Sequence, residues 1–178
     1  GIYDRALEIL QEAGLTVLEL SGVEPNPRIE SVRKGVEICK KEKIDMILSI
    51  GGGSVIDCGK VIAAGACSEG DAWELVLHPE KIKAALPLYC VLTLAATGSE
   101  MDGAAVISDL EKQEKWVTAS EYMKPVMAVM DPEYTFSVSR KQTAAGTADI
   151  ISHIFENYFT SVKAADVQAR FAEGLLKT

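Results

Sequence analysis

The sequence lacks the features that mark several classes of protein. No apolar run approaches the roughly 20 residues that a membrane-spanning helix needs. The first residues, GIYDRALEIL, do not have the basic and then apolar layout of a signal peptide. The four cysteines lie far apart without a CxxC pair, so we expect small core residues rather than a disulfide framework or a zinc site. The sequence therefore predicts a cytoplasmic protein that does not bind a membrane.

Positive charge is scarce as well. The chain has 18 Lys and Arg residues against 26 Asp and Glu residues, which gives a formal net charge of -8. Surfaces that bind nucleic acids or anionic membranes need clustered Lys and Arg, so neither partner is expected. Any anionic ligand must be held by local contacts. The 178 residues, 48% of them hydrophobic, suffice for one ordinary core and the beginning of a second domain.

Helical and strand-like periodicities alternate along most of the chain. This alternation predicts right-handed crossovers and a parallel sheet that is covered on both faces. Two short apolar runs that bracket a charged turn predict a β-hairpin. The predicted helices are 2–13, a helix from 28, and a helix that follows the glycines and ends at about 66; the strands are 15–20, 44–50, 86–94 and 126–130; and the hairpin strands are 104–108 and 116–118.

The pattern changes near Ser137. Ser139, followed three residues later by Gln142, has the spacing of a capping box at the start of a helix. From there to Thr178 the pattern is helical, and the expected apolar face includes Ile150, Ile154 and Tyr158. We predict two domains: an α/β domain over residues 1–137, and the beginning of a helical domain over residues 138–178.

Three glycines join a predicted buried strand to a predicted helix in ILSIGGGSVIDCGKVIAAGA, residues 47–66. The first N–H groups of a helix have no intrahelical partners, and glycines there let a phosphate approach them. Ser54 would supply either the N-cap or a phosphate contact, with Asp57 and Lys60 about one and two turns further on. The spacing matches neither the P-loop nor the usual Rossmann fingerprint. A tight turn, with glycines for close packing, is the alternative.

Two further segments carry candidate site residues. In LAATGSEMDG, residues 94–103, Thr97 and Ser99 stand beside a glycine after another predicted strand, as in a ligand-binding loop or an ordinary loop. In TAAGTADIISHIFE, residues 143–156, Asp149 and His153 are four apart and share one helix face. That is a metal-ligand spacing, although such a pair also occurs simply as a helix-stabilising surface pair.

Together these segments resemble one family. The stretches SGVEPNPRIESV, ILSIGGGSVIDCGK, LTLAATGSEM and RKQTAAGTADIISH are similar to those of the iron-containing, or group III, alcohol dehydrogenases, particularly the NADPH-dependent butanol dehydrogenase branch. The resemblance extends over essentially the whole chain. It implies a Rossmann-like parallel sheet with a β-hairpin, followed by the start of an all-helical metal-binding domain, as in the dehydroquinate synthase-like fold.

The resemblance also implies a chemistry. It indicates hydride transfer between NADPH or NADH and a small alcohol or aldehyde, such as butanol or butanal, with Fe(II) or alternatively Zn(II) as the metal. A homodimer is expected by the same analogy. The implied cofactor-binding residues are Gly52, Gly53, Ser54, Asp57, Thr93, Thr97 and Lys115, and the implied metal ligands are Asp149 and His153.

The family pattern contains parts that this sequence does not show. The family completes its metal site with two later histidines, and His78 is the only other histidine here. A first strand with its own glycine-rich loop precedes the equivalent of Ile2 in the family. We therefore expect this chain to be a fragment of a longer protein. The alternatives are a glycerol dehydrogenase-like or dehydroquinate synthase-like enzyme, or a nucleotide-binding module without catalysis of its own.

Overall fold

The chain folds around a small parallel sheet. In the computed structural model, which describes all 178 residues, three strands pair in the order β1–β2–β5 and run in the same direction. The strands are β1 (Ile47–Gly51), β2 (Leu88–Leu92) and β5 (Met127–Val129), each shorter than the run that predicted it. The predicted parallel sheet is confirmed. Because Gly51 lies opposite Leu92, the segments that follow β1 and β2 leave the sheet at the same edge.

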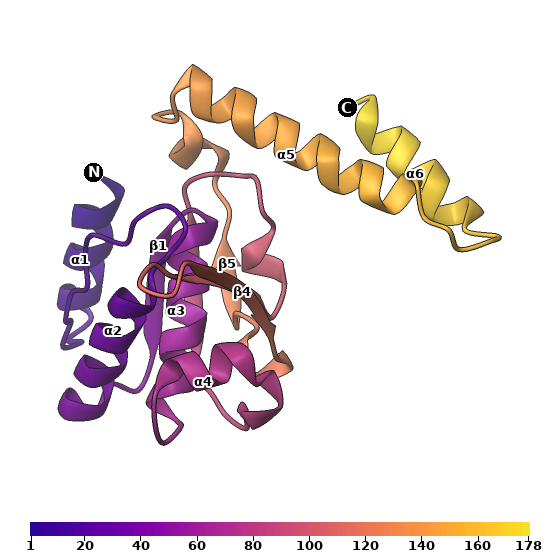
Figure 1. Cartoon of the computed structure of the whole chain (residues 1–178). Helices are drawn as coiled ribbons and strands as arrows, with labels where there is room; N and C mark the ends of the chain where they lie inside the picture. The colour runs from indigo at the N-terminus through magenta and orange to yellow at the C-terminus, as the bar shows by residue number, and fades with distance from the viewer.

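The helices before residue 100 form most of the core. They are α1 (Ile2–Glu12), α2 (Ile29–Glu42), α3 (Gly53–Ala66) and α4 (Ala72–Leu77), and the short α4 was not predicted. The main cluster of 16 buried residues comes chiefly from α2, α3, α4 and the hairpin. A smaller cluster joins Ile56 of α3 to Leu88, Cys90 and Leu92 of β2. Helix α3 thus packs against both the sheet and the hairpin (Figure 1).

The predicted hairpin is present as a separate two-stranded antiparallel sheet. Its strands are β3 (Ala104–Asp109) and β4 (Glu114–Ala119). It is joined to the loop before α2, because the Ser108 N–H donates to the Pro27 carbonyl at 2.9 Å. Four short 3-10 turns complete this part: η1 (Pro79–Lys81), η2 (Ser99–Met101), η3 (Glu121–Met123) and η4 (Pro132–Thr135).

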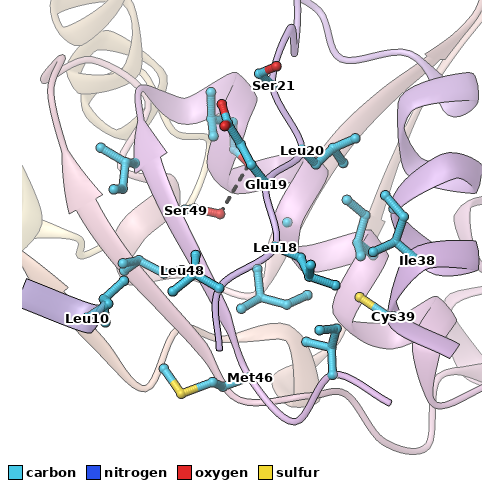
Figure 2. Close-up of a pocket in the computed structure, with 18 of the residues that line it drawn as sticks. Leu10, Leu18, Glu19, Leu20, Ser21, Ile38, Cys39, Met46, Leu48 and Ser49 are labelled. Atoms are coloured by element: carbon cyan, nitrogen blue, oxygen red, sulfur yellow. Dashed lines mark hydrogen bonds between the residues drawn. The ribbon is translucent and has the colours of Figure 1, made fainter. Parts of the chain in front are cut away.

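The prediction of a strand over residues 15–20 was wrong. Figure 2 shows Leu18, Glu19 and Leu20 running alongside β1 in the same direction, but a cavity of about 470 Å³ separates the two segments. None of the backbone hydrogen bonds of the chain involves residues 16–20. The apolar alternation that suggested a strand is real, but a strand also needs a partner at about 4.8 Å.

The same cavity borders the free edge of β1. The Ile47 N–H donates to Pro87 and the Gly51 carbonyl accepts from Thr93, so alternate residues of β1 bond to β2. By the geometry of a parallel ladder, the N–H and C=O groups of Leu48 and Ile50 face the cavity instead. Segment 15–20 and β1 therefore lie parallel as two walls of one slot, without a ladder between them.

The last 40 residues form two helices that pack on each other and extend away from the sheet (Figure 1). They are α5 (Arg140–Tyr158) and α6 (Asp166–Leu176), so the predicted helical pattern is interrupted between them. The predicted N-cap is confirmed, with Ser139 Oγ accepting from the Gln142 N–H at 3.2 Å. Helix α5 buries only Gly146, and much of its apolar face, including Ile150, is open.

Two further features concern hydropathy and the burial of the cysteines. No helix combines the length and the apolar character that crossing a membrane would require. Cys39, Cys58 and Cys90 are buried as predicted, but Cys67, which directly follows α3, is exposed. Burial raises the pKa of the Cys58 thiol to about 12, so that thiol is protonated and unreactive at neutral pH, as expected.

Candidate functional site

The glycine turn forms the N-terminal end of α3. Gly52 is the N-cap, and its carbonyl accepts from the N–H groups of Val55 and Ile56 at 3.0 and 3.2 Å. The N–H groups of Gly52, Gly53 and Ser54 donate to no acceptor in the chain. Three free donors therefore stand at the positive end of a 14-residue helix dipole. This arrangement suits an anion, above all a phosphate.

The glycines are also needed for packing. A Cβ atom on Gly53 would lie 2.2 Å from Thr97 Oγ1, and one on Gly52 would lie 3.3 Å from Leu94 Cβ. The loop after β2 therefore lies directly against the turn. Close packing, the alternative reading of the sequence, is thus present. The N–H groups of the turn, which the first turn of any helix leaves without intrahelical partners, remain open to a ligand.

Ser54 is available to a ligand. Because α3 begins at Gly53 and Gly52 is its N-cap, Ser54 lies inside the first turn, and the N-cap alternative for it was wrong. Its side chain is half-buried, and its hydroxyl has no hydrogen-bond partner in the chain. Of the two roles considered from the sequence, contact with an anion is the one the geometry leaves open.

Thr93 and Thr97 lie at the same edge of the sheet. The Thr93 N–H donates to the Gly51 carbonyl at 3.0 Å, which joins the two strand ends. Thr97 Oγ1 accepts from the Ser99 N–H at 3.3 Å, across a turn in which Gly98 has a φ of +70°. Both threonines are therefore next to the glycine turn.

Asp57 has its carboxylate bound within the chain. Oδ1 accepts from Ser99 Oγ at 2.5 Å and Oδ2 accepts from the Val106 N–H at 2.9 Å. Burial raises the pKa of this carboxyl, against the opposing effect of Ser99, Val106 and Lys60. The structure thus places Asp57 one turn behind the free N–H groups, holding the loop and β3. A cofactor would have to compete with those two bonds for its oxygens.

Lys60 and Ser99 belong to the same site, although neither is among the cofactor-binding residues that the family resemblance implied. Lys60 Nζ, on a fully buried side chain, donates to Ser99 Oγ at 2.9 Å and to Asp102 Oδ1 at 2.8 Å. The signal that could have found it is a lysine three residues after an aspartate on an otherwise apolar helix. Such a charge is kept inside a protein only when it is paired.

Lys115 lies on β4 and is exposed. Its Nζ donates to Asn26 Oδ1 at 2.7 Å, so it bridges the hairpin to the loop that follows segment 15–20. The structure gives it no contact with the glycines. Lys115 is therefore brought to the neighbouring loop rather than to the turn itself.

Asp149 and His153 share one face of α5, as predicted. Asp149 Oδ2 lies 3.8 Å from His153 Nε2, and both side chains are about half exposed. No group of three or more His, Cys, Asp or Glu residues that could hold a metal ion occurs in residues 1–178. The pair offers two donors, whereas a tetrahedral site needs four. His78 lies elsewhere, with Nδ1 3.5 Å from Glu80 Oε1.

Helix α5 contacts the turn region at Gly146. A Cβ atom on Gly146 would lie 3.3 Å from the Ala95 carbonyl oxygen and 3.5 Å from Ala96 Cβ. The α5 backbone thus packs on the loop between Thr93 and Thr97. The candidate metal residues begin one turn further along the same helix.

With these features in place, the comparison with known proteins is decisive. The sequence model of the family described as iron-containing alcohol dehydrogenase matches residues 1–132. The chain belongs to the iron-containing alcohol dehydrogenase family. The match includes the glycine turn, both threonines and the hairpin, so these features lie in the part of the chain that the family shares.

Members of this family resemble the chain over its whole length. It is 56% identical to NADH-dependent butanol dehydrogenase A of Clostridium acetobutylicum and 42% identical to the NADPH-dependent aldehyde reductase YqhD of Escherichia coli, covering 100% of this chain and 46% of each relative. The crystal structure of NADH-dependent butanol dehydrogenase A from Thermotoga maritima superposes with a TM-score of 0.89 at 39% identity, covering 100% of this chain and 47% of that one. The chain spans about half the length of the relatives it matches.

Proposed function

We propose that the protein catalyses reversible hydride transfer between a nicotinamide coenzyme and a small alcohol or aldehyde, such as butanol or butanal. The observation that carries this proposal is the set of three free N–H groups on Gly52, Gly53 and Ser54 at the start of α3. The names of the relatives, two butanol dehydrogenases and an aldehyde reductase, support the same reaction class.

The glycine turn fits the pyrophosphate of NADH or NADPH. Its free N–H groups and the helix dipole attract negative charge, and the absence of side chains lets the phosphate oxygens come within hydrogen-bond distance. The Ser54 hydroxyl adds a donor. This local arrangement matters because the chain as a whole carries a net charge of -8 and would otherwise repel the coenzyme.

The remaining cofactor residues are proposed in two groups. Thr93 and Thr97, beside the turn, contribute hydroxyl groups to the coenzyme. Lys115 contributes an exposed ammonium group next to the loop that contains Asn26. Asp57 acts through the loop that it holds, because both of its oxygens already accept hydrogen bonds. The relatives use different coenzymes, so NADH and NADPH are both tested below.

Asp149 and His153 are proposed as two ligands of Fe(II) or Zn(II). A carboxylate oxygen and an imidazole nitrogen on one helix face, 3.8 Å apart, suit either ion, with further donors completing the coordination. When bound, the ion acts as a Lewis acid on the carbonyl oxygen of the substrate. Gly146 keeps the helix that carries the pair in contact with the loop beside the glycine turn.

The coenzyme site is tested by titrating residues 1–178 with NADH and NADPH in a calorimeter. Gly53→Asp adds a negative charge and a side chain where Thr97 leaves no room, and we expect it to weaken binding at least about tenfold. Gly174→Asp makes the same change on α6, where a Cβ meets nothing within 4 Å, and should leave binding unchanged. A wild-type chain that is folded by circular dichroism and binds neither coenzyme contradicts the proposal.

The metal residues are tested in the protein at its native length. Purified His153→Gln should retain less iron or zinc than the wild type, while His78→Gln, the same change at the other histidine, should retain as much. Equal metal content in both variants contradicts the ligand assignment. With butanal as substrate, a net change in nicotinamide absorbance is expected, and its absence would favour a synthase-type reaction in which the coenzyme is regenerated.

A cytoplasmic location and a homodimer complete the proposal. The first is supported by the absence of any helix that could cross a membrane, together with four unpaired cysteines. The second rests on the family resemblance alone. Sedimentation of the native-length protein measures it directly.

A further inference from the structure

Lys60 is the largest side chain in the chain that is completely buried. Removing an ammonium group from water is costly, and an apolar side chain of similar volume would usually serve stability at least as well. The charge is nevertheless fully paired. Besides Ser99 and Asp102, its Nζ donates to the Ala104 carbonyl at 2.7 Å, so each of its three N–H groups has an acceptor.

All three acceptors belong to one segment, residues 99–104, which connects β2 to the hairpin. Lys60 and Asp57 both reach this segment from α3, three residues apart. The Ser99 hydroxyl lies between them: it accepts from Lys60 and donates to Asp57. Asp102 Oδ1 also accepts from the Ala104 N–H at 2.9 Å, which closes the segment on itself. We call these four side chains, Asp57, Lys60, Ser99 and Asp102, the clasp.

The clasp ends two residues from the contact with the glycine turn. The Ser99 N–H donates to Thr97 Oγ1, and Thr97 Oγ1 occupies the space that a side chain at Gly53 would need. A continuous path of contacts therefore runs from Lys60 through Ser99 and Thr97 to Gly53 of the glycine turn. Thr97 itself is exposed, and its loop has no strand ladder to hold it.

We propose that Lys60 is a positioning residue, whose buried ammonium holds the Thr97–Asp102 loop against the glycine turn and so sets the affinity for the coenzyme. This inference rests on the proposed function for its second half. The first half, that Lys60 holds the loop in place, depends only on the hydrogen bonds and contacts described above. Lys60 itself touches no part of the turn; it acts through Ser99 and Thr97.

The test compares Lys60→Met, which keeps most of the length of the side chain and removes its charge, with Lys34→Met on the exposed surface of α2. Amide hydrogen exchange is followed without coenzyme. In Lys60→Met the amides of Ser99, Met101 and Ala104 should exchange at least about tenfold faster, while those in the middle of α2 keep their rates. Coenzyme binding should weaken by about tenfold, because the loop must be ordered on binding. Lys34→Met should change neither quantity.

A second variant covers the case in which Lys60→Met does not fold. The side chain of Asp102 is about half exposed, so Asp102→Ala removes one arm of the clasp without leaving a cavity in the core. It should show the same local exchange and a loss of affinity of about threefold. Asp102→Asn keeps the Oδ1 acceptor and should restore both values towards the wild type, which a purely structural disturbance would not predict.

The outcomes separate the two proposals. The positioning role is overturned if the loop amides of Lys60→Met exchange at the wild-type rate, or if exchange is equally faster throughout the chain. This holds for any measured affinity for the coenzyme. Faster local exchange with unchanged affinity overturns the link to binding. If the folded wild type binds neither coenzyme, the proposed function fails, while the exchange rates still decide whether Lys60 holds the loop.

Discussion

Helices α3 and α5 carry the two halves of the candidate site, but they are embedded very differently. Ten of the 14 residues of α3 are buried, between the sheet and the hairpin. Only Gly146 among the 19 residues of α5 is buried. The residues proposed for the coenzyme are thus fixed by contacts within this chain. The residues proposed for the metal stand on a helix whose apolar side chains, such as Phe155, are largely open.

The difference shows that the position of a site residue is fixed only as firmly as the helix that carries it is packed. Around α3, packing and hydrogen bonds determine where the free N–H groups point. Around α5, the spacing of the helix alone brings Asp149 and His153 together. The following predictions test that contrast, beginning with the largest expected effect.

The two helices should differ most in how much stability is lost when an apolar side chain is truncated. Ile56→Ala on α3 removes a fully buried side chain and should lower the free energy of unfolding by about 2 to 5 kcal/mol. Ile150→Ala is the same chemical change on α5, where the side chain is 40% exposed, and should cost less than about 1 kcal/mol. Urea unfolding measures both values. Equal losses would mean that α5 is covered in solution.

Alkaline pH should destabilise the part around α3. Burial raises the pKa of Cys58 from 9.0 to about 12, so the folded state favours the neutral thiol. Its contribution to stability is complete below pH 9 and declines as the pH rises towards 12. At pH 10 linkage gives a loss of about 1.4 kcal/mol, which should be absent in Cys58→Ala. Cys67→Ala, at an exposed thiol, should behave like the wild type.

The smallest effect is expected at the helix N-caps. Asp71 Oδ1 accepts from the Trp73 N–H at the start of α4. The carboxylate also accepts two hydrogen bonds from Arg33, from Nε to Oδ1 at 3.0 Å and from Nη2 to Oδ2 at 2.6 Å. The Arg33 hydrogen bond lowers the pKa of Asp71, so this contribution is present above pH 3.8 and is lost as the pH falls through the lowered value.

Asp71→Ala should therefore cost about 1 kcal/mol of global stability at pH 7. Ser139→Ala removes the N-cap of α5 and should mainly loosen that helix locally. Circular dichroism and urea unfolding, recorded together, distinguish the two responses. A global loss for Ser139→Ala as large as that for Asp71→Ala would contradict the contrast between the helices.

Much of this arrangement could be read from the sequence, and the exceptions have physical causes. Helix α3 was predicted close to its observed bounds because its apolar face, its glycines and the strand before it all indicate the same element. Segment 15–20 has the pattern of a strand, but pairing depends on a neighbour that periodicity does not show. The six residues of α4 are too few for a periodic signal, and their cap depends on Arg33, 38 residues away. The clasp was missed for a similar reason, since Lys60 and its acceptors are 39 to 44 residues apart.

The Gly146 contact also has a mechanical consequence. Since a glycine offers no side chain, the α5 backbone lies directly against the Ala95–Ala96 loop at the point where Gly146 stands. At 1.5 Å per residue, Asp149 lies about 4.5 Å from that point and Tyr158 about 18 Å. A tilt of about 10° would therefore move the far end of the helix by about 3 Å but Asp149 by less than about 1 Å. Such a tilt would therefore leave Asp149, a proposed metal ligand, close to the loop proposed for the coenzyme and would displace mainly the far end of the helix.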